Sequence, residues 1–304
     1  MTLNDLQKKI IALKKEKGAV ILAHSYQTPD ILEIADYTGD SFKLSTVATE
    51  LESNIIVLCG VRFMAETIKI LSPEKTVILP VPEATCPMAE QISPERVKNF
   101  KKENPDTCVV AYINTTAELK AQCDVCVTSS SALKIVSNIK EDKILFIPDK
   151  NLGSYVKNAV KEKDFTLWEG FCPVHNAIIK KECESVKEKY PNAKLLMHPE
   201  IPLDALEYAD VVGSTADIIN YALNTDDECI IGTENAVLQY LQLKKPNGKF
   251  YPLSKNLICP DMKLTTLGDV YNALAGEGGE VIELSEELRL SAKKPIDEMI
   301  RLGS

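Results

Sequence analysis

The chain has 304 residues, of which 45% are hydrophobic and 26% charged, so the composition predicts a folded protein with a large core and excludes a disordered one. The formal net charge of −9 argues against nucleic acid or an anionic membrane surface as a partner. Nine cysteines are too few for a disulfide-rich scaffold, no apolar run approaches about 18 residues, and the N-terminus lacks the pattern of a signal peptide. We therefore expect a soluble protein of a reducing compartment, the cytoplasm.

Residues 1–18 open the chain with the pattern of an amphipathic, lysine-rich helix. Short apolar runs follow, separated by stretches of helical pattern, and they form three series of four. The first run of each series ends at a polar residue, namely His24, Tyr112 or His198. The predicted strands are residues 20–24, 35–41, 55–59 and 77–80, then 109–112, 123–129, 144–147 and 165–168, then 195–198, 209–215, 229–231 and 250–253.

Short strands rich in Val, Ile and Leu that alternate with helices predict parallel sheets covered by helices. We therefore expect an α/β protein built of three αβα sandwich units around a pseudo-threefold axis, with the active site at their common interface. The units span residues 1–86, 87–172 and 173–284. A C-terminal helix, residues 285–304, is expected to pack back on the first unit.

Polar side chains gather where the first strand of each unit ends. Ligands of such folds bind beyond the carboxyl ends of the strands, so these residues are expected to share one site. Their acids, phenols and imidazoles suit proton transfer on a small acid with several functional groups. The third histidine, His175, follows Cys172 by three residues and is a candidate hydrogen-bond donor to a metal-bound sulfur. The strand-end residues form three pairs: His24 and Tyr26, Tyr112 and Asn114, His198 and Glu200.

A hydroxyl residue also ends each second strand, just before a helical pattern, at Ser41, Ser129 and Thr215. Such residues are good N-caps, and a helix N-terminus also binds phosphate or carboxylate through its free N–H groups. Capping alone explains any single one of them. Their recurrence at three equivalent positions favours anion binding as well.

Three Cys-Pro dipeptides recur at intervals of 86 and 87 residues, with the cysteines Cys86, Cys172 and Cys259. Proline fixes the local backbone, and a threefold repeat brings equivalent loops to one axis, so three thiols are expected to converge. Three thiolates could hold zinc and a water, but thiolate ligands also favour an iron–sulfur cluster with one open iron. The Cys123-x-x-Cys126 pair is a weak redox or zinc signal, because no second pair accompanies it.

Ten short segments form a set that is specific although each alone is short, namely residues 24–27, 39–41, 63–66, 84–89, 112–114, 148–153, 172–175, 198–200, 213–215 and 232–234. By these segments the chain resembles the quinolinate synthase family over essentially its full length. Residues that depart from the family's common pattern are Ser25, Arg62 and Ser130-Ser131, and Arg62 is expected to add positive charge near an anionic substrate.

The resemblance implies a triplicated αβα fold and a [4Fe–4S] cluster held by Cys86, Cys172 and Cys259. It implies condensation of iminoaspartate with dihydroxyacetone phosphate to quinolinate, phosphate and water in NAD biosynthesis, with the open iron as a Lewis acid. Implied partners are the iron–sulfur assembly machinery and an L-aspartate oxidase or dehydrogenase that supplies iminoaspartate. The catalytic residues are expected to be Tyr26, His198, Glu200 and His24. The implied substrate-binding residues are His24, Ser41, Tyr112, Asn114, Ser129, His198, Glu200, Ser214 and Thr215.

Three other functions share parts of this pattern. Another iron–sulfur hydro-lyase would use the same site on a different small acid. A non-catalytic cluster carrier would need the thiols alone, so the histidine, tyrosine and glutamate residues argue against it. A zinc protein would hold a single ion in place of the cluster.

Overall fold

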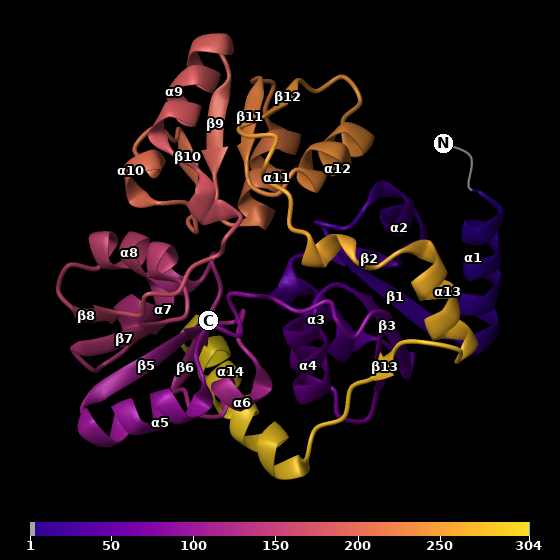
Figure 1. Ribbon diagram of the computed structural model, residues 1–304, viewed down its shortest axis with the longest axis horizontal. Helices are drawn as coiled ribbons and strands as arrows, with labels where there is room; N and C mark the ends of the chain where they lie inside the picture. The colour runs from indigo at the N-terminus through magenta and orange to yellow at the C-terminus, as the bar shows by residue number, and fades with distance from the viewer. Residues whose placement is uncertain (1–3, 304) are drawn as a thin grey trace.

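The computed structural model describes residues 4–303 and shows three separate β-sheets, each flanked by helices (Figure 1). The three groups of elements lie at the corners of a triangle in this view. The predicted α/β class with three αβα units is thereby confirmed. Residues 1–3 and Ser304 of the two predicted terminal helices lie outside the described residues.

The first sheet is formed by strands close to those predicted from the sequence. Its first strand is rich in Val, Ile and Leu and is buried along nearly its whole length. The elements in order are α1 (Asp5–Lys17), β1 (Ala19–His24), α2 (Pro29–Ile34), β2 (Tyr37–Gly39), α3 (Ser41–Glu50), β3 (Ile55–Cys59), α4 (Arg62–Leu71) and β4 (Thr76–Leu79).

The second sheet repeats this order of helices and strands. Its elements are α5 (Pro94–Glu103), β5 (Thr107–Tyr112), α6 (Ala117–Lys120), β6 (Val125–Val127), α7 (Ala132–Asn138), β7 (Lys143–Ile147), α8 (Lys150–Ala159) and β8 (Asp164–Leu167).

The third sheet repeats it again, preceded by the short 3₁₀ turn η1 (His175–Ala177). Its elements are α9 (Lys180–Lys189), β9 (Lys194–Met197), α10 (Leu203–Leu206), β10 (Val211–Val212), α11 (Thr215–Asn224), β11 (Cys229–Gly232), α12 (Ala236–Lys244) and β12 (Phe250–Pro252).

The three sheets share one strand order. In each, the first strand of the unit lies between the second and the third, and the fourth lies outside the third, all parallel. Because the strands of a unit are parallel, their carboxyl ends lie along one edge of the sheet, and the polar residue that ends the first strand lies at that edge. This arrangement places one set of loops from every unit at the common centre.

An aspartate just before each second strand ties it to the first strand. Its Oδ2 atom accepts the backbone N–H of a buried first-strand residue at 2.8 Å in all three units. The aspartate also pairs with a lysine of the helix that precedes the first strand of its unit, at 2.8, 2.6 and 3.1 Å in chain order. We call this arrangement the aspartate clamp. Its aspartate, strand residue and lysine are Asp36, Ile21 and Lys14, then Asp124, Val109 and Lys101, then Asp210, Leu195 and Lys187.

The segment after β12 returns to the first two units. It contains η2 (Asp261–Lys263), α13 (Leu267–Ala275), β13 (Glu280–Val281) and α14 (Glu286–Gly303). Helix α13 shares a hydrophobic cluster with α1, and β13 pairs antiparallel with β4 at the edge of the first sheet. The exact limits of the three units stay a prediction.

Helix α14 corrects one expectation, because it lies mainly on the second unit and not on the first. Ala292, Ile296 and Met299 belong to the core cluster of the second sheet, and Asn138 of α7 bonds the Leu302 carbonyl at 3.1 Å. The apolar face of the first unit is already covered by α1 and α13. The helices α6 and α7 beside β6 are short, so α14 completes the cover there. None of the helices within residues 4–303 combines the length and apolarity needed to cross a bilayer.

Candidate active site

The carboxyl ends of the three sheets meet at one cavity, which collects side chains from every unit. The catalytic, substrate-binding and cysteine-ligand residues expected from the sequence all line it, with the exception of Ser214. These are His24, Tyr26, Ser41, Cys86, Tyr112, Asn114, Ser129, Cys172, His198, Glu200, Thr215 and Cys259, together with His175.

The predicted helix caps are one or two residues out of place. Helix α3 is capped by Asp40, and Ser41 is its first residue. Helix α11 is capped by Ser214, whose hydroxyl donates to Asp217 Oδ2 at 2.6 Å. The two neighbouring residues therefore have different roles. The Ser214 hydroxyl is bonded within its own helix, whereas Thr215 lines the cavity. In the second unit the cap of α7 is Ser131, two residues after Ser129.

Each Cys-Pro dipeptide begins a tight turn that aims backbone N–H groups at the sulfur. The Cys86 sulfur accepts from Ala89, that of Cys172 from His175, and that of Cys259 from Met262, three residues on in every case. The proline cannot donate and fixes its own backbone angle, so the turn presents the following N–H groups to the sulfur. Such donors favour a thiolate over a thiol.

Two of the cysteine loops are also held by a buried carboxylate. Asp149 Oδ2 accepts the Cys172 N–H at 3.1 Å, and Glu234 Oε1 accepts the Cys259 N–H at 3.3 Å. Strand register places Val61 at the equivalent position of the first unit, where no carboxylate is available. The three loops are therefore related in geometry but not in charge.

The thiols are poorly suited to ionise without a metal. Burial raises the pKa of the Cys86 thiol to about 12 and that of Cys259 to about 11, and it raises the pKa of Cys172 well above its usual value. Sulfur binds a metal as thiolate, so a bound cation would reverse this penalty. The donor set of this cavity thus fits a metal group better than it fits three free thiols.

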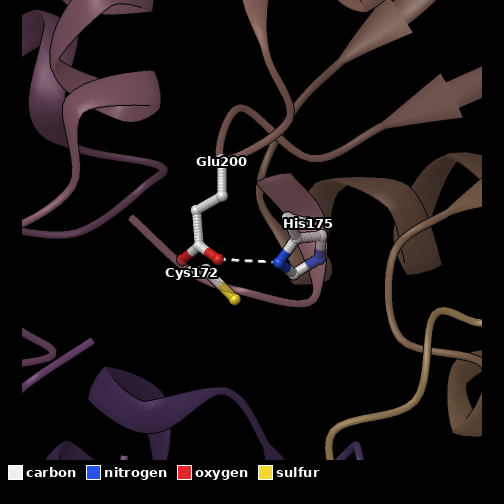
Figure 2. Close-up of side chains that lie close together, drawn as sticks. All are labelled: Cys172, His175 and Glu200. Atoms are coloured by element: carbon white, nitrogen blue, oxygen red, sulfur yellow. Dashed lines mark ion pairs between the residues drawn. The ribbon is translucent and has the colours of Figure 1, made fainter. Parts of the chain in front are cut away.

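Spacing limits what that group is. We looked within residues 4–303 for sets of three or more Cys, His, Asp or Glu side chains whose ligand atoms all lie within 4.8 Å of one another. One such set is present, formed by Cys172, His175 and Glu200 (Figure 2). The three cysteines do not form such a group. Sulfurs on a single tetrahedral zinc ion would lie about 3.8 Å apart, given a Zn–S bond of about 2.3 Å. At least one pair of the three cysteine sulfurs therefore lies more than 4.8 Å apart, which is wider than on a single tetrahedral zinc ion.

Glu200 is the charged centre of the cavity wall. Its Oε2 atom lies 2.7 Å from His175 Nδ1 (Figure 2). The same atom lies 4.0 Å from His198 Nδ1, and the carboxylate also accepts a hydrogen bond from Tyr112. Burial alone would raise the pKa of Glu200, but the attraction of His198 and His175 and the bonds from His175 and Tyr112 hold it below its usual value. Glu200 is therefore ionised at neutral pH, buried, and stabilised by its neighbours.

The two strand-end histidines are neutral at neutral pH. Burial, and then the nearby Lys263 cation, lower the pKa of His24 to about 3. Burial also lowers the pKa of His198 to about 4, against the opposing attraction of Glu200. Neutral imidazoles donate from one nitrogen and accept at the other, so both can orient a polar substrate.

Sequence reasoning missed three residues that complete the site, namely Thr233, Glu234 and Lys263. Thr233 and Glu234 follow β11 in the Gly-Thr-Glu segment that had been noted only as a motif. Lys263 Nζ lies 3.1 Å from Glu234 Oε1 and also bonds the Tyr26 carbonyl, so it ties the Cys259 loop to the first unit. Arg62, by contrast, does not line the cavity: its guanidinium pairs with the Glu280 carboxylate of β13, which offsets the positive charge expected from it.

Comparison with known proteins decides the family. The family model described as "Quinolinate synthetase A protein" matches residues 8–301. The chain belongs to the quinolinate synthetase A family. Proteins named "Quinolinate synthase" from Caldicellulosiruptor bescii and Alkaliphilus metalliredigens are 49% and 48% identical to it, over 100% and 97% of both chains. One from Clostridium perfringens strain SM101 is 48% identical over 98% of this chain and 99% of its own. Of the ten segments by which the sequence resembles the quinolinate synthase family, nine contribute a residue to the cavity lining, the exception being residues 148–153.

Proposed function

We propose that the chain condenses iminoaspartate with dihydroxyacetone phosphate to give quinolinate, phosphate and water, as a step of NAD biosynthesis. The observation that carries this proposal is the convergence of three thiols, two neutral histidines, two tyrosines and one ionised glutamate on one cavity from three separate sheets. The name printed for its full-length relatives supports the same activity. A carrier of clusters would not require the proton-transfer residues.

The metal group in this proposal is a [4Fe–4S] cluster held by Cys86, Cys172 and Cys259. The number of thiols that line the cavity and the N–H groups aimed at their sulfurs support it, and so does a separation of more than 4.8 Å between at least two of the sulfurs. When bound, such a cluster supplies one iron without a protein thiolate, which acts as a Lewis acid towards a substrate oxygen.

Substrate anions are held by local donors, because the chain as a whole is acidic with a net charge of −9. Ser41 and Thr215 are the first residues of two ten-residue helices whose N-termini face the cavity. Free N–H groups at such ends bind phosphate and carboxylate without cationic side chains. Ser129, before α7, supplies a third hydroxyl.

Proton transfers are assigned by position and chemistry. Tyr26 moves protons during isomerisation and loss of phosphate from dihydroxyacetone phosphate. Glu200 and His198 serve ring closure and loss of water. His24, Tyr112 and Asn114 orient the substrate, since each places a donor or acceptor at the cavity wall.

The proposal also sets the surroundings in which the enzyme works. Three thiols that take up an iron–sulfur group require a reducing compartment, so we place the protein in the cytoplasm, supplied by the iron–sulfur assembly machinery. Iminoaspartate would come from an L-aspartate oxidase or dehydrogenase, because oxidation of the amine of aspartate produces it.

Anaerobic purification with analysis of iron, sulfide and quinolinate formation tests this function. We expect a brown protein with iron and sulfide that forms quinolinate, and Cys172→Ala should lose both colour and activity. Cys183→Ala is the matched control, since Cys183 is buried in α9 and does not line the cavity. Zinc in place of iron would overturn the cluster. Cluster without quinolinate would point to another hydro-lyase or to a carrier.

A further inference from the structure

One backbone hydrogen bond ties each cysteine loop to the turn between the third strand and the next helix of its unit. The donor is an N–H group at the start of that helix, and the acceptor is the carbonyl two residues before the cysteine. The distance is 2.8 Å in all three units. The pairs are Arg62 and Ala84, Lys150 and Gly170, and Asn235 and Leu257. The three cysteine loops thus share one backbone anchor.

The side chains that support this anchor differ between the units. In the second and third units, Asp149 and Glu234 also accept the N–H of the cysteine itself. The equivalent residue of the first unit is Val61, whose side chain cannot accept a hydrogen bond. The Cys86 loop is therefore held by a different side chain or is held less firmly than the other two.

Arg62, the residue after Val61, holds the Cys86 loop with its side chain. Its guanidinium donates to the carbonyl of Pro82, four residues before Cys86, at 3.2 Å. The same guanidinium binds both carboxylate oxygens of Glu280, and the Nη1–Oε1 distance is 3.0 Å. A forked contact of this kind fixes the plane of the guanidinium, so Glu280 also fixes the direction of the bond to Pro82.

Glu280 reaches this position on a strand that extends the first sheet. Strand β13 pairs antiparallel with β4 and places Glu280 opposite Leu79 (Figure 1). Within residues 4–303, the fourth strands of the other two units, β8 and β12, are the outer strands of their sheets. The C-terminal segment thus brings a carboxylate to the one unit whose strand–helix turn lacks it, and this carboxylate acts through Arg62.

We propose that Arg62 and Glu280 are positioning residues that hold the Cys86 loop in the conformation that binds the metal group. Neither side chain lines the cavity, so both act through the loop. The inference rests on the proposed function in one respect, namely that Cys86 is a cluster ligand. Loss of the pair should loosen Cys86 alone, because the loops of Cys172 and Cys259 keep their own carboxylates.

Release of iron from the loaded protein to bathophenanthroline disulfonate under anaerobic conditions tests this. Arg62→Met keeps an unbranched stem but removes every donor, and we expect iron to leave about 3- to 10-fold faster, as for loss of a partly exposed ion pair and one hydrogen bond. Arg289→Met is the matched control and should leave the rate unchanged. The Arg289 guanidinium also binds both oxygens of a glutamate, Glu286, and donates to a carbonyl, that of Ile70 in α4.

A second measurement identifies which cysteine is loosened. Iodoacetamide alkylates the metal-free, full-length chain, and mass spectrometry of its peptides gives a rate for each cysteine. Arg62→Met should raise the rate at Cys86 about 3- to 10-fold and leave Cys172 and Cys259 near wild type, whereas a general loss of stability would raise all three. Glu280→Gln should also act at Cys86 alone. The double variant should react no faster than Arg62→Met, because Glu280 acts through Arg62.

The outcomes separate this inference from the proposed function. An unchanged rate at Cys86, equal rises at all three cysteines, or additive effects of the two substitutions would overturn the inference. If Arg62→Met does not fold, Glu280→Gln alone must raise the rate at Cys86. A wild-type protein that takes up no iron would overturn the proposed function, and the alkylation rates would still decide whether the Arg62–Glu280 pair holds the loop.

Discussion

The aspartate clamps and the strand-end residues lie in the same three repeated units, yet they differ in how strictly they repeat. Every clamp consists of an aspartate and a lysine at equivalent positions, and in each the aspartate Oδ2 lies 2.8 Å from the backbone nitrogen of a first-strand residue. The strand ends hold histidine, tyrosine and histidine, followed two residues later by tyrosine, asparagine and glutamate. A clamp meets the same local need three times, namely to satisfy one buried N–H beside a strand edge. The strand ends face one cavity from three directions, and a substrate without threefold symmetry requires a different group from each.

The largest expected effect is a loss of turnover on substitution of a strand-end residue, because these residues differ from unit to unit. Tyr26→Phe removes the hydroxyl that both Thr215 and Thr233 contact, and we expect turnover to fall about 10²- to 10⁴-fold, the usual cost of losing an acid–base group. Visible absorption, iron content and melting temperature should stay close to wild type. Tyr190→Phe is the control, because Tyr190 stacks on Tyr251 and does not line the cavity. Retained turnover in Tyr26→Phe would remove this residue from its assigned role.

Removal of the aspartate from each of the three clamps should lower stability by a similar amount in every unit. Asp36→Ala, Asp124→Ala and Asp210→Ala each leave one buried N–H without its acceptor, at a cost of about 1–3 kcal/mol in the free energy of unfolding. Urea unfolding measures these costs. Asp5→Ala, which removes an exposed pair with Lys8, should cost less than about 1 kcal/mol. Strongly unequal costs would show that the three clamps do different work.

The features that repeat in all three units are also those that could be predicted from the sequence. The recurrence of Cys-Pro and of apolar runs predicted three similar units, and nearly all strands begin and end within two residues of the expected positions. The predicted caps failed where two or more capping residues are adjacent, as in Asp40-Ser41 and Ser214-Thr215. Sequence alone does not show which of two neighbours leaves the helical conformation.

Errors and omissions gather where distant segments meet. The position of α14 depends on which apolar face the short helices α6 and α7 leave open, and that is a tertiary property. Thr233 and Lys263 are ordinary residue types, and their roles come from contacts with Tyr26, more than 200 positions away in sequence. A motif can mark such residues, as Gly-Thr-Glu did, but only the fold gives them partners.

Acid should reveal the difference between the strand ends. The folded-state pKa values of His24 and His198, about 3 and 4, lie below the unfolded value of about 6.5, so the unfolded chain binds more protons between these limits. Stability is therefore complete above about pH 6.5 and falls as the pH drops towards 4, by about 1 kcal/mol for each histidine at pH 5.5. Urea unfolding of the metal-free chain between pH 7 and 5 measures this. His24→Gln and His198→Gln should each flatten the slope, whereas Tyr112→Phe should leave it steep, and equal slopes in all three would contradict the neutral histidines.

At the N-terminus of α11, two neighbouring hydroxyl residues have different partners, and we expect the smallest effects there. The Ser214 hydroxyl is bonded to Asp217 within the cap of α11, and the neighbouring Thr215 hydroxyl bonds Tyr26 at the cavity. Ser214→Ala should therefore lower the free energy of unfolding by about 1 kcal/mol, the cost of a lost N-cap, and change KM for dihydroxyacetone phosphate less than about twofold. Thr215→Val should do the reverse, with a larger change in kinetics than in stability. Steady-state kinetics and urea unfolding of both variants separate the two roles. A marked rise in KM for Ser214→Ala would place this serine among the substrate-binding residues, and the helix cap and the site would then share one hydroxyl.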